Sequence, residues 1–378
     1  KKLHKDLDRY GMLHLLRHGI VDTPAKFSLC FFKPASSMNQ TNLKMYEENI
    51  LSITRQVRYS LKNENSIDVV LFVNGLPIST IELKNAITGQ TVANAKKQYM
   101  HDRSSHDLLL RFKSRCIVHF AVDTDEVWMT TRLKGIDTYF LPFNKGNNGG
   151  KGNPVGGGNY RTSYLWDEVL QKDSILDIIH RFIHLENTEK ETLIFPRYHQ
   201  LDVVRKLVSD VKDKGTGNNY LIQHSAGSGK SNSIAWLSHH LSNLHDANDK
   251  VIFNSTIVIT DRRVLDKQLQ DTIYQFEHVE GVVVKIDSDS TQLAEALNTG
   301  KKIIITTIQK FPFILEKINN FEGKRFAIIV DEAHSSQSGK ASQKMKAILG
   351  DANNFSEEKL LQQVADDEAK EEDFFHGR

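Results

Sequence analysis

The N-terminal half of the chain contains short apolar runs separated by turn residues or polar segments. Three of these runs have the length and β-branched content of strands: Val69–Val73, Ser79–Leu83 and Cys116–Val122. Asn74-Gly75 separates the first two runs. Because an Asn-Gly pair between apolar runs is a strong signal for a tight turn, the pattern predicts a β-hairpin followed by a further strand.

The C-terminal half alternates apolar runs with polar or amphipathic segments of helical length. Short continuous apolar runs are typical of strands that are buried on both faces. Strands that alternate with helices form parallel sheets covered by those helices. This half is therefore predicted to be a parallel α/β sheet, with strands at Tyr220–Gln223, Ser255–Thr260, Val282–Ile286, Lys302–Thr306 and Phe326–Val330.

A change of composition separates the two halves. Residues 146–158 read GNNGGKGNPVGGG, and so glycine-rich a stretch forms a loop rather than a packed core. Residues 163–184 place apolar side chains at helical spacing. We expect a domain over 1–145, a loop and connecting helix over 146–185, a second domain over 186–350 and an acidic, truncated C-terminal segment over 351–378.

The overall composition is that of an ordinary globular protein. Of the 378 residues, 39% are hydrophobic and 25% are charged, and no apolar run reaches the ~20 residues of a membrane helix. Two cysteines, Cys30 and Cys116, fit a reducing compartment, so we expect a cytoplasmic protein that does not bind membranes. The net charge of +2 excludes a histone-like protein but leaves local basic grooves open.

A glycine-rich turn in the C-terminal half has the features of a phosphate-binding loop. The turn Gly227-Ser228-Gly229-Lys230-Ser231 follows a short apolar run and precedes a helical segment. Glycines let backbone N–H groups surround an anion, the lysine reaches the phosphates, and the serine hydroxyl binds Mg²⁺. His224 stands where the full motif has its first glycine. An ordinary strand–helix turn is the alternative.

Two adjacent acids, Asp331 and Glu332, end the last apolar run. Asp331 is the candidate ligand for Mg²⁺ beside the phosphate-binding loop, and Glu332 is the candidate general base for an attacking water. An acid pair in isolation is more often a solvated strand end. In combination with the loop 101 residues upstream, it predicts a nucleotide site.

Three residues in the N-terminal half form a second candidate site. Glu82 and Lys84 are two residues apart on a predicted strand and therefore share a face, and Asp68 begins the neighbouring strand. Paired carboxylates hold Mg²⁺, and a lysine can orient or activate water, as a metal-dependent phosphodiesterase requires. The alternative is a surface salt-bridge cluster.

The C-terminal motifs resemble the first motor domain of superfamily 2 helicases and translocases. The resemblance rests on the phosphate-binding loop, the DEAH sequence at 331–334, and segments 256–262 and 306–309. It implies a RecA-like domain in which Gln200 reads adenine. It further implies that Arg262 and Thr307 face nucleic acid and that His334 couples nucleotide to DNA.

The N-terminal stretch 46–89 resembles the motor subunit of type I restriction enzymes, with a nuclease of the PD-(D/E)xK fold built on a mixed sheet. Ile67 replaces the usual proline, and Ser335 stands where arginine is expected. Family members carry a glutamine and a tyrosine downstream. Here Ala95 occupies the glutamine position, so Gln98 and Tyr99 are the candidates for that role.

The resemblance implies ATP and Mg²⁺ as cofactors, and double-stranded DNA together with methyltransferase and specificity subunits as partners. It implies an ATP-dependent translocase with endonuclease activity. A translocase closes two RecA-like lobes around ATP, so we expect this chain by itself to bind ATP and DNA without translocating. The alternatives are a helicase-nuclease of DNA repair, and a nucleotide-gated DNA-binding module with an inactive nuclease.

Overall fold

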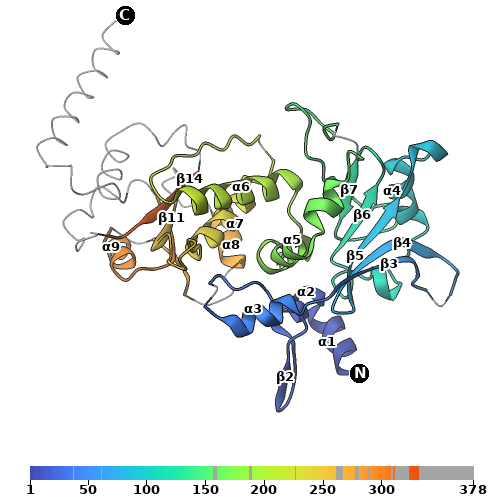
Figure 1. The fold of residues 1–378 in the computed structure, drawn as a ribbon, viewed down its shortest axis with the longest axis horizontal. Coiled ribbons are helices and arrows are strands. Elements are labelled where there is room, and N and C mark those ends of the chain that lie inside the picture. Colours follow the sequence, from blue (N-terminus) through green and yellow to red (C-terminus); the bar gives the residue numbers. More distant parts are fainter. Residues whose placement is uncertain are drawn as a thin grey trace, which may run out of the picture. The chain divides into compact units, whose positions relative to one another are not determined.

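The structure, a computed structural model, divides into two compact units, Lys1–Arg205 and Lys206–Arg378 (Figure 1). It describes residues 1–36, 38–60, 62–155, 160–186, 190–225, 227–260, 267–276, 281–287, 290–307, 310 and 323–331. Across these residues, no helix has the length and apolar character needed to span a membrane. The two units are described separately.

A mixed sheet forms the centre of the first unit. Within the described residues its order is β3-β4-β5-β6-β7-β8, and β5 and β6 are its parallel pair. The strands are β3 (Leu51–Arg58), β4 (Ser66–Val73), β5 (Leu76–Leu83), β6 (Val118–Val122), β7 (Val127–Thr130) and β8 (Leu141–Pro142).

The predicted hairpin is confirmed. β4 and β5 pair antiparallel, and Asn74 and Gly75 join them with φ of 49° and 80°. Two successive positive φ values give the turn the twist that matches its flanking strands, and Asn and Gly are the residues that adopt them most readily. The connection from β5 to the parallel strand β6 contains α4 (Val92–His101), as a crossover requires.

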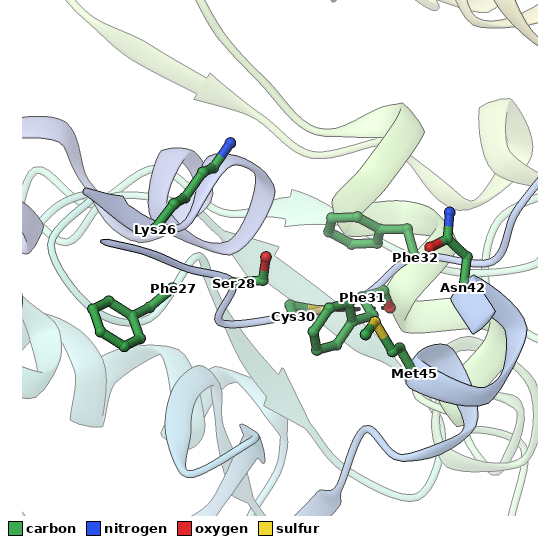
Figure 2. A pocket seen from close by; sticks show the side chains of 8 residues that line it. All are labelled: Lys26, Phe27, Ser28, Cys30, Phe31, Phe32, Asn42 and Met45. Carbon is green, nitrogen blue, oxygen red and sulfur yellow. Dashed lines mark hydrogen bonds between the residues drawn. The ribbon is translucent and has the colours of Figure 1, made fainter. Parts of the chain in front are cut away.

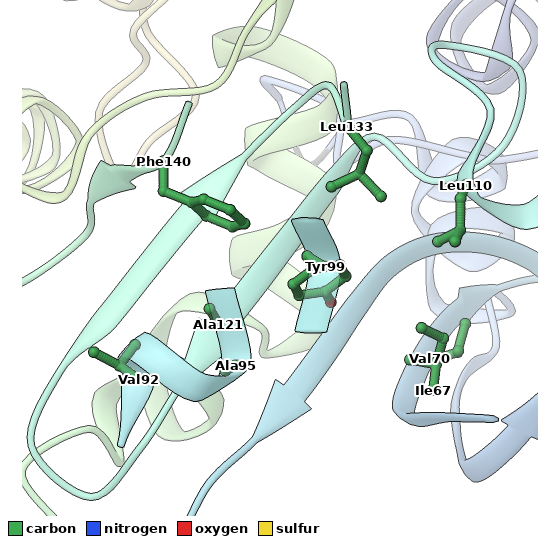
Figure 3. Packing of buried hydrophobic residues seen from close by; sticks show 9 residues of the cluster. All are labelled: Ile67, Val70, Val92, Ala95, Tyr99, Leu110, Ala121, Leu133 and Phe140. Atoms are coloured by element: carbon green, nitrogen blue, oxygen red, sulfur yellow. The ribbon is translucent and has the colours of Figure 1, made fainter. Parts of the chain in front are cut away.

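α4 covers one face of this sheet and builds the core there. Its residues Val92, Ala95 and Tyr99 are buried against Val70 and Ala121 from the strands (Figure 3). The helix begins after Thr91, where the side chain of Asn94 accepts a hydrogen bond from the Thr91 N–H over 2.9 Å. The crossover helix is therefore capped at its start and held by apolar packing along its length.

Further elements of the first unit lie before and after this sheet. The predicted helical segment 163–184 is confirmed as α5 (Lys172–Asp177) between π-helical turns at Leu165–Val169 and Ile178–Phe182. Residues 146–155 contain no helix or strand. The remaining elements are α1 (Lys2–Tyr10), α2 (Met12–His18), α3 (Gln40–Glu47), β1 (Ile20–Asp22), β2 (Ala25–Phe27), β9 (His184–Glu186) and β10 (Thr192–Ile194); α6 (Tyr198–Lys214) crosses into the second unit.

A parallel sheet forms the second unit, in the order β12-β13-β11-β14 among the described residues. Its strands are β11 (Ser255–Thr260), β12 (Val283–Lys285), β13 (Ile303–Thr307) and β14 (Phe326–Val330), and its helices are α7 (Lys230–Ser242), α8 (Lys267–Gln275) and α9 (Ser290–Asn298). The predicted fold class, a mixed-sheet α/β domain followed by a parallel α/β domain, is confirmed.

Both faces of the parallel sheet are covered. On one face, Ile257 and Ile304 pack against Leu293 and Leu297 of α9. On the other, Ala327 of β14 packs in a cluster with Leu241 of α7. Two-sided burial explains why these strands read as continuous apolar runs in the sequence.

The predicted strand at Tyr220–Gln223 is wrong. The structure assigns no strand to residues 220–223, and the Leu221 side chain is 87% exposed. A strand requires a neighbour that pairs with its backbone N–H and C=O groups, and apolar side chains do not supply this. The strands at Ser255–Thr260 and Phe326–Val330 are confirmed with the predicted bounds.

Candidate functional site

Asp68 and Glu82 lie opposite each other on neighbouring strands. The antiparallel register pairs Val69 with Ile81 and Val70 with Thr80, which places Asp68 on β4 across from Glu82 on β5. Directly opposed residues of an antiparallel pair project from the same face. The structure therefore brings together the two carboxylates that the sequence predicted to converge.

Glu82 is a buried carboxylate with one paired oxygen. Its side chain is 0% exposed, and Oε1 accepts a hydrogen bond from Nε of Arg103 over 2.7 Å. Oε2 is buried and receives no hydrogen bond from the described residues. Burial raises the pKa of Glu82 to about 7, the Arg103 guanidinium opposes that shift, and the neighbouring Asp68 carboxylate adds to it.

Asp68 is half-buried and held by donors on both of its oxygens. The Leu83 N–H donates to Oδ2 over 2.8 Å, and Nε2 of Gln56 donates to Oδ1 over 3.1 Å. Gln56 lies on β3 across from Asp68, because the register pairs Arg55 with Val69 and Val57 with Ile67. Asp68 is therefore oriented from the strands on either side of it.

The donor set fits a divalent cation. Mg²⁺ prefers carboxylate oxygens, takes one or two of them from a protein and keeps several water ligands. Asp68 and Glu82 supply two carboxylates, and the buried Oε2 of Glu82 lacks a hydrogen-bond donor in the described part of the chain. No group of three or more His, Cys, Asp or Glu side chains with metal-binding geometry occurs among the described residues. Asp68 and Glu82 would therefore hold the ion together with water.

Lys84 follows β5 at the same end of the site. Its backbone N–H donates to the Val122 carbonyl over 2.8 Å, so the strand pairing continues to this residue. Because side chains alternate along an extended strand, Lys84 lies on the same face as Glu82. The lysine is half-buried, and its role at the site stays a prediction.

Tyr99 occupies the core beneath α4 (Figure 3). It is 0% exposed, and its hydroxyl lies 2.8 Å from Oγ1 of Thr80, two residues before Glu82. Because the Tyr99 ring is buried, it cannot contact DNA. Its hydroxyl instead contacts β5 at Thr80. Gln98 is half-buried, and its Oε1 has no hydrogen-bond partner among the described residues.

Sequence reasoning missed Arg103 and Gln56, which contact the two carboxylates. Arg103 lies 21 residues after Glu82, and Gln56 lies 12 residues before Asp68. Neither position carries a local motif. The strand register could have identified Gln56, but the sequence does not determine where β3 begins relative to β4.

The predicted phosphate-binding loop leads directly into a helix. α7 begins at Lys230, with Ser231 as its second residue, and Gly229 precedes it with φ of 85°. Gly227 has φ of 73°. Both values lie in the left-handed region, which glycine adopts without the steric cost of a Cβ. Ser228, Lys230 and Ser231 thus lie at a helix N-terminus, where N–H groups and the helix dipole favour an anion.

Asp331 and Thr307 lie at the carboxyl edge of the parallel sheet. β13 and β11 are in register with Thr307 beside Thr260, and the Asp331 N–H donates to the Ile259 carbonyl over 2.9 Å. Thr307 is 2% exposed. α7 packs against β11, β13 and β14. The structure thus gathers Thr307, Asp331 and the helix that carries Lys230 in one unit.

Four other predicted residues remain to be placed: Gln200, Arg262, Glu332 and His334. Gln200 is on α6 in the first unit, where it is 4% exposed and its Oε1 accepts a hydrogen bond from the Arg197 N–H over 2.9 Å. Arg262, Glu332 and His334 lie outside the described residues. A pocket of about 620 Å³ between β2, residues 28–32 and α3 (Figure 2) is lined by none of the predicted site residues.

Comparisons with known protein families match one region in each half of the chain. Residues 33–137 match the N-terminal region of type I restriction enzyme R proteins, and residues 199–356 match the SWI2/SNF2 ATPase family. The chain is therefore similar to type I restriction enzyme R proteins in its N-terminal half and to SWI2/SNF2 ATPases in its C-terminal half. The R-protein region contains Asp68, Glu82 and Lys84, and the ATPase region contains Lys230 and Asp331.

Curated proteins named as type I restriction enzyme endonuclease subunits are similar to this chain over most of its length. A type I restriction enzyme endonuclease subunit of Staphylococcus saprophyticus is 28% identical over 77% of this chain and 30% of its own length. One from Staphylococcus aureus is 25% identical over 82% of this chain and 32% of its own. One from Haemophilus influenzae is 27% identical over 72% and 26%. The chain therefore spans about a third of the length of the curated relatives it matches.

Proposed function

We propose that this chain carries the Mg²⁺-dependent DNA endonuclease site and an ATP-binding motor domain of a type I restriction enzyme. One observation carries the nuclease assignment. Asp68 and Glu82 face each other across β4 and β5, and the buried Oε2 of Glu82 lacks a donor among the described residues. An unsatisfied carboxylate oxygen beside a second carboxylate is costly in a protein interior unless a proton or a cation compensates it, and a divalent cation compensates both carboxylates at once.

The residues of the nuclease site would act in distinct ways. When bound, Mg²⁺ stabilises negative charge on the phosphate that is cut. Asp68 and Glu82, on two paired strands, would hold the ion. Lys84 shares their face and would orient, or take a proton from, the attacking water.

The nucleotide site uses the helix N-terminus of the second unit. Gly227, Ser228, Gly229 and Lys230 would bind the phosphates of ATP, and Ser231 and Asp331 would hold its Mg²⁺. The match to SWI2/SNF2 ATPases and the left-handed glycines before α7 support this assignment. We further propose Gln200 as the adenine-reading residue and Glu332 as the general base.

The DNA-contact assignments rest on the resemblance of the C-terminal motifs to superfamily 2 motor domains, and the partner assignment rests on the relatives. Arg262 is proposed to face double-stranded DNA, and His334 to couple nucleotide hydrolysis to DNA movement. Thr307 is proposed for the same DNA side of the domain, where its burial limits it to positioning neighbouring residues. Gln98 and Tyr99 are proposed to support the nuclease site. Because the relatives are named as endonuclease subunits of type I restriction enzymes, we propose that the chain works with methyltransferase and specificity subunits.

One observation favours a second candidate, a DNA-binding module with an inactive nuclease. The Arg103 guanidinium already neutralises Glu82 at 2.7 Å, so a cation is present at the carboxylate without a metal. The two candidates differ in the expected effect of Mg²⁺. An active nuclease cuts only with the metal, and an inactive module binds DNA with or without it.

The experiment that tests the proposal is reconstitution of the enzyme from an endonuclease subunit that contains this chain, together with methyltransferase and specificity subunits, on a plasmid that carries their recognition sequence. We expect cleavage that requires both ATP and Mg²⁺ and that stops with EDTA. ATP-dependent DNA binding without cleavage would instead support the inactive module. Cleavage without the recognition subunits would support a repair-type helicase-nuclease.

A further inference from the structure

A series of hydrogen bonds connects the two carboxylates of the proposed nuclease site to their neighbours, and it begins at Arg103. Nε of Arg103 donates to Oε1 of Glu82 over 2.7 Å, and Nη2 donates to the backbone carbonyl of Ser66 over 2.8 Å. The Arg103 side chain is 4% exposed. One guanidinium therefore joins β5, through Glu82, to the start of β4.

The series of hydrogen bonds continues through Gln56 to Asp68. Oγ of Ser66 donates to Oε1 of Gln56 over 2.7 Å, and Nε2 of Gln56 donates to Oδ1 of Asp68 over 3.1 Å. The Leu83 N–H, next to Glu82, donates to the other oxygen of Asp68 over 2.8 Å. Both carboxylates thus accept hydrogen bonds from fixed donors: Asp68 from β3 and β5, and Glu82 from the segment after α4.

The backbone at Gln56 supplies an independent observation. Its φ is 51°, although it lies within β3. A left-handed conformation is uncommon for a residue other than glycine, and such strained residues cluster at functional sites. Gln56 is exposed, so apolar packing does not explain the conformation. The contacts of its side chain are to Ser66 and Asp68.

We propose that Arg103 and Gln56 are positioning residues of the metal site, each holding one carboxylate oxygen so that Oε2 of Glu82 and the remaining lone pairs of Asp68 face a divalent cation. The inference rests on the proposed nuclease function. Residues that orient metal ligands in this way commonly change metal affinity by 10- to 100-fold when they are mutated. A fixed donor on one oxygen also leaves the second oxygen as the ligand.

The test measures Mn²⁺ binding to the full chain without nucleotide, by titration calorimetry. Glu82→Gln removes a proposed ligand and therefore defines the binding that belongs to this site. Arg103→Lys keeps the charge but cannot reach Glu82 and Ser66 with one planar group, and Gln56→Ala removes an exposed side chain. Arg58→Ala, at an exposed arginine of the same strand, and Gln90→Ala, at an exposed glutamine, are the matched controls.

We expect wild type and both controls to bind Mn²⁺ equally, with affinity about 10-fold or more lower in Gln56→Ala and Arg103→Lys. In the assembled enzyme, the same two variants should need more Mg²⁺ for cleavage and recover at high Mg²⁺. A loss of packing would not be rescued by the metal. Circular dichroism establishes that each variant is folded. If Arg103→Lys does not fold, Gln56→Ala still decides the test, because Gln56 is exposed and its replacement leaves the core unchanged.

The titration distinguishes failure of the positioning roles from failure of the metal site. Unchanged affinity in Gln56→Ala, or tighter binding in Arg103→Lys, overturns the positioning roles and leaves the metal site standing. Tighter binding would show that Arg103 takes the place of the cation. Equal Mn²⁺ binding by wild type and Glu82→Gln overturns the metal site itself, and the positioning roles fall with it.

Discussion

Thr80 and His119 face each other on the parallel strands β5 and β6, with 2.7 Å between Oγ1 and Nδ1. His119 is 1% exposed, and its ring packs near that of Tyr99. Burial lowers the pKa of His119 from 6.5 to about 3. The imidazole is therefore neutral in the folded protein over the whole range in which an exposed histidine takes up a proton.

This burial predicts acid sensitivity of the first unit. Below pH 6.5 the unfolded chain protonates His119, and the folded chain does so only near pH 3. Lowering the pH in this window therefore favours unfolding, by about 1.4 kcal/mol per pH unit from this residue. Urea unfolding of His119→Asn should show a shallower pH dependence than wild type. His106→Asn, at an exposed position, should keep the wild-type slope; equal slopes for both variants would contradict the prediction.

Lys84→Ala should remove DNA cleavage and leave ATP hydrolysis intact. Lys84 shares the face of Glu82, and a group that orients or deprotonates water contributes roughly 10²- to 10⁴-fold to a rate. Cleavage of plasmid and release of phosphate are measured in the same reconstituted enzyme. Lys97→Ala changes an exposed lysine of α4 and serves as the control. Cleavage at the wild-type rate by Lys84→Ala would remove Lys84 from the site.

Lys230→Ala should stop ATP turnover. The lysine begins α7 directly after Gly229, where its ammonium would reach the phosphates. We expect hydrolysis to fall at least about 100-fold, to the background of the assay, and ATP-dependent cleavage to be lost with it. The exposed Lys250 supplies the control variant, Lys250→Ala. Turnover that persists in Lys230→Ala would refute the nucleotide site.

Ala95→Gln should destabilise the first unit, although glutamine is the residue that relatives were expected to carry at this position. Ala95 is 0% exposed and packs in the cluster around Tyr99 and Val70 (Figure 3). A larger side chain with an amide would overpack this cluster and bury polar atoms, at about 1–3 kcal/mol of unfolding free energy. Ala93→Gln, at an exposed position of the same helix, should unfold like wild type in urea. Equal stability of the two variants would show that the cluster can rearrange.

Local patterns were sufficient for much of the fold. The Asn74-Gly75 turn and the apolar runs of β11 and β14 act over a few residues, and the structure confirms them. The segment 220–223 was predicted wrongly because its apolar content is equally local, whereas strand formation depends on a pairing partner. The site residues themselves, from Asp68 to Asp331, stay predictions until the variants are measured.

The sequence by itself determined the candidate chemistry of this protein: two carboxylates and a lysine on a hairpin, and a phosphate-binding turn before a helix. Residue identity and spacing along one strand or turn are sufficient for these, because alternation and backbone conformation are local properties. The tertiary structure decided which distant side chains complete the site. Arg103 reaches Glu82, and Gln56 reaches Asp68, only because the strand register and the crossover through α4 bring them there.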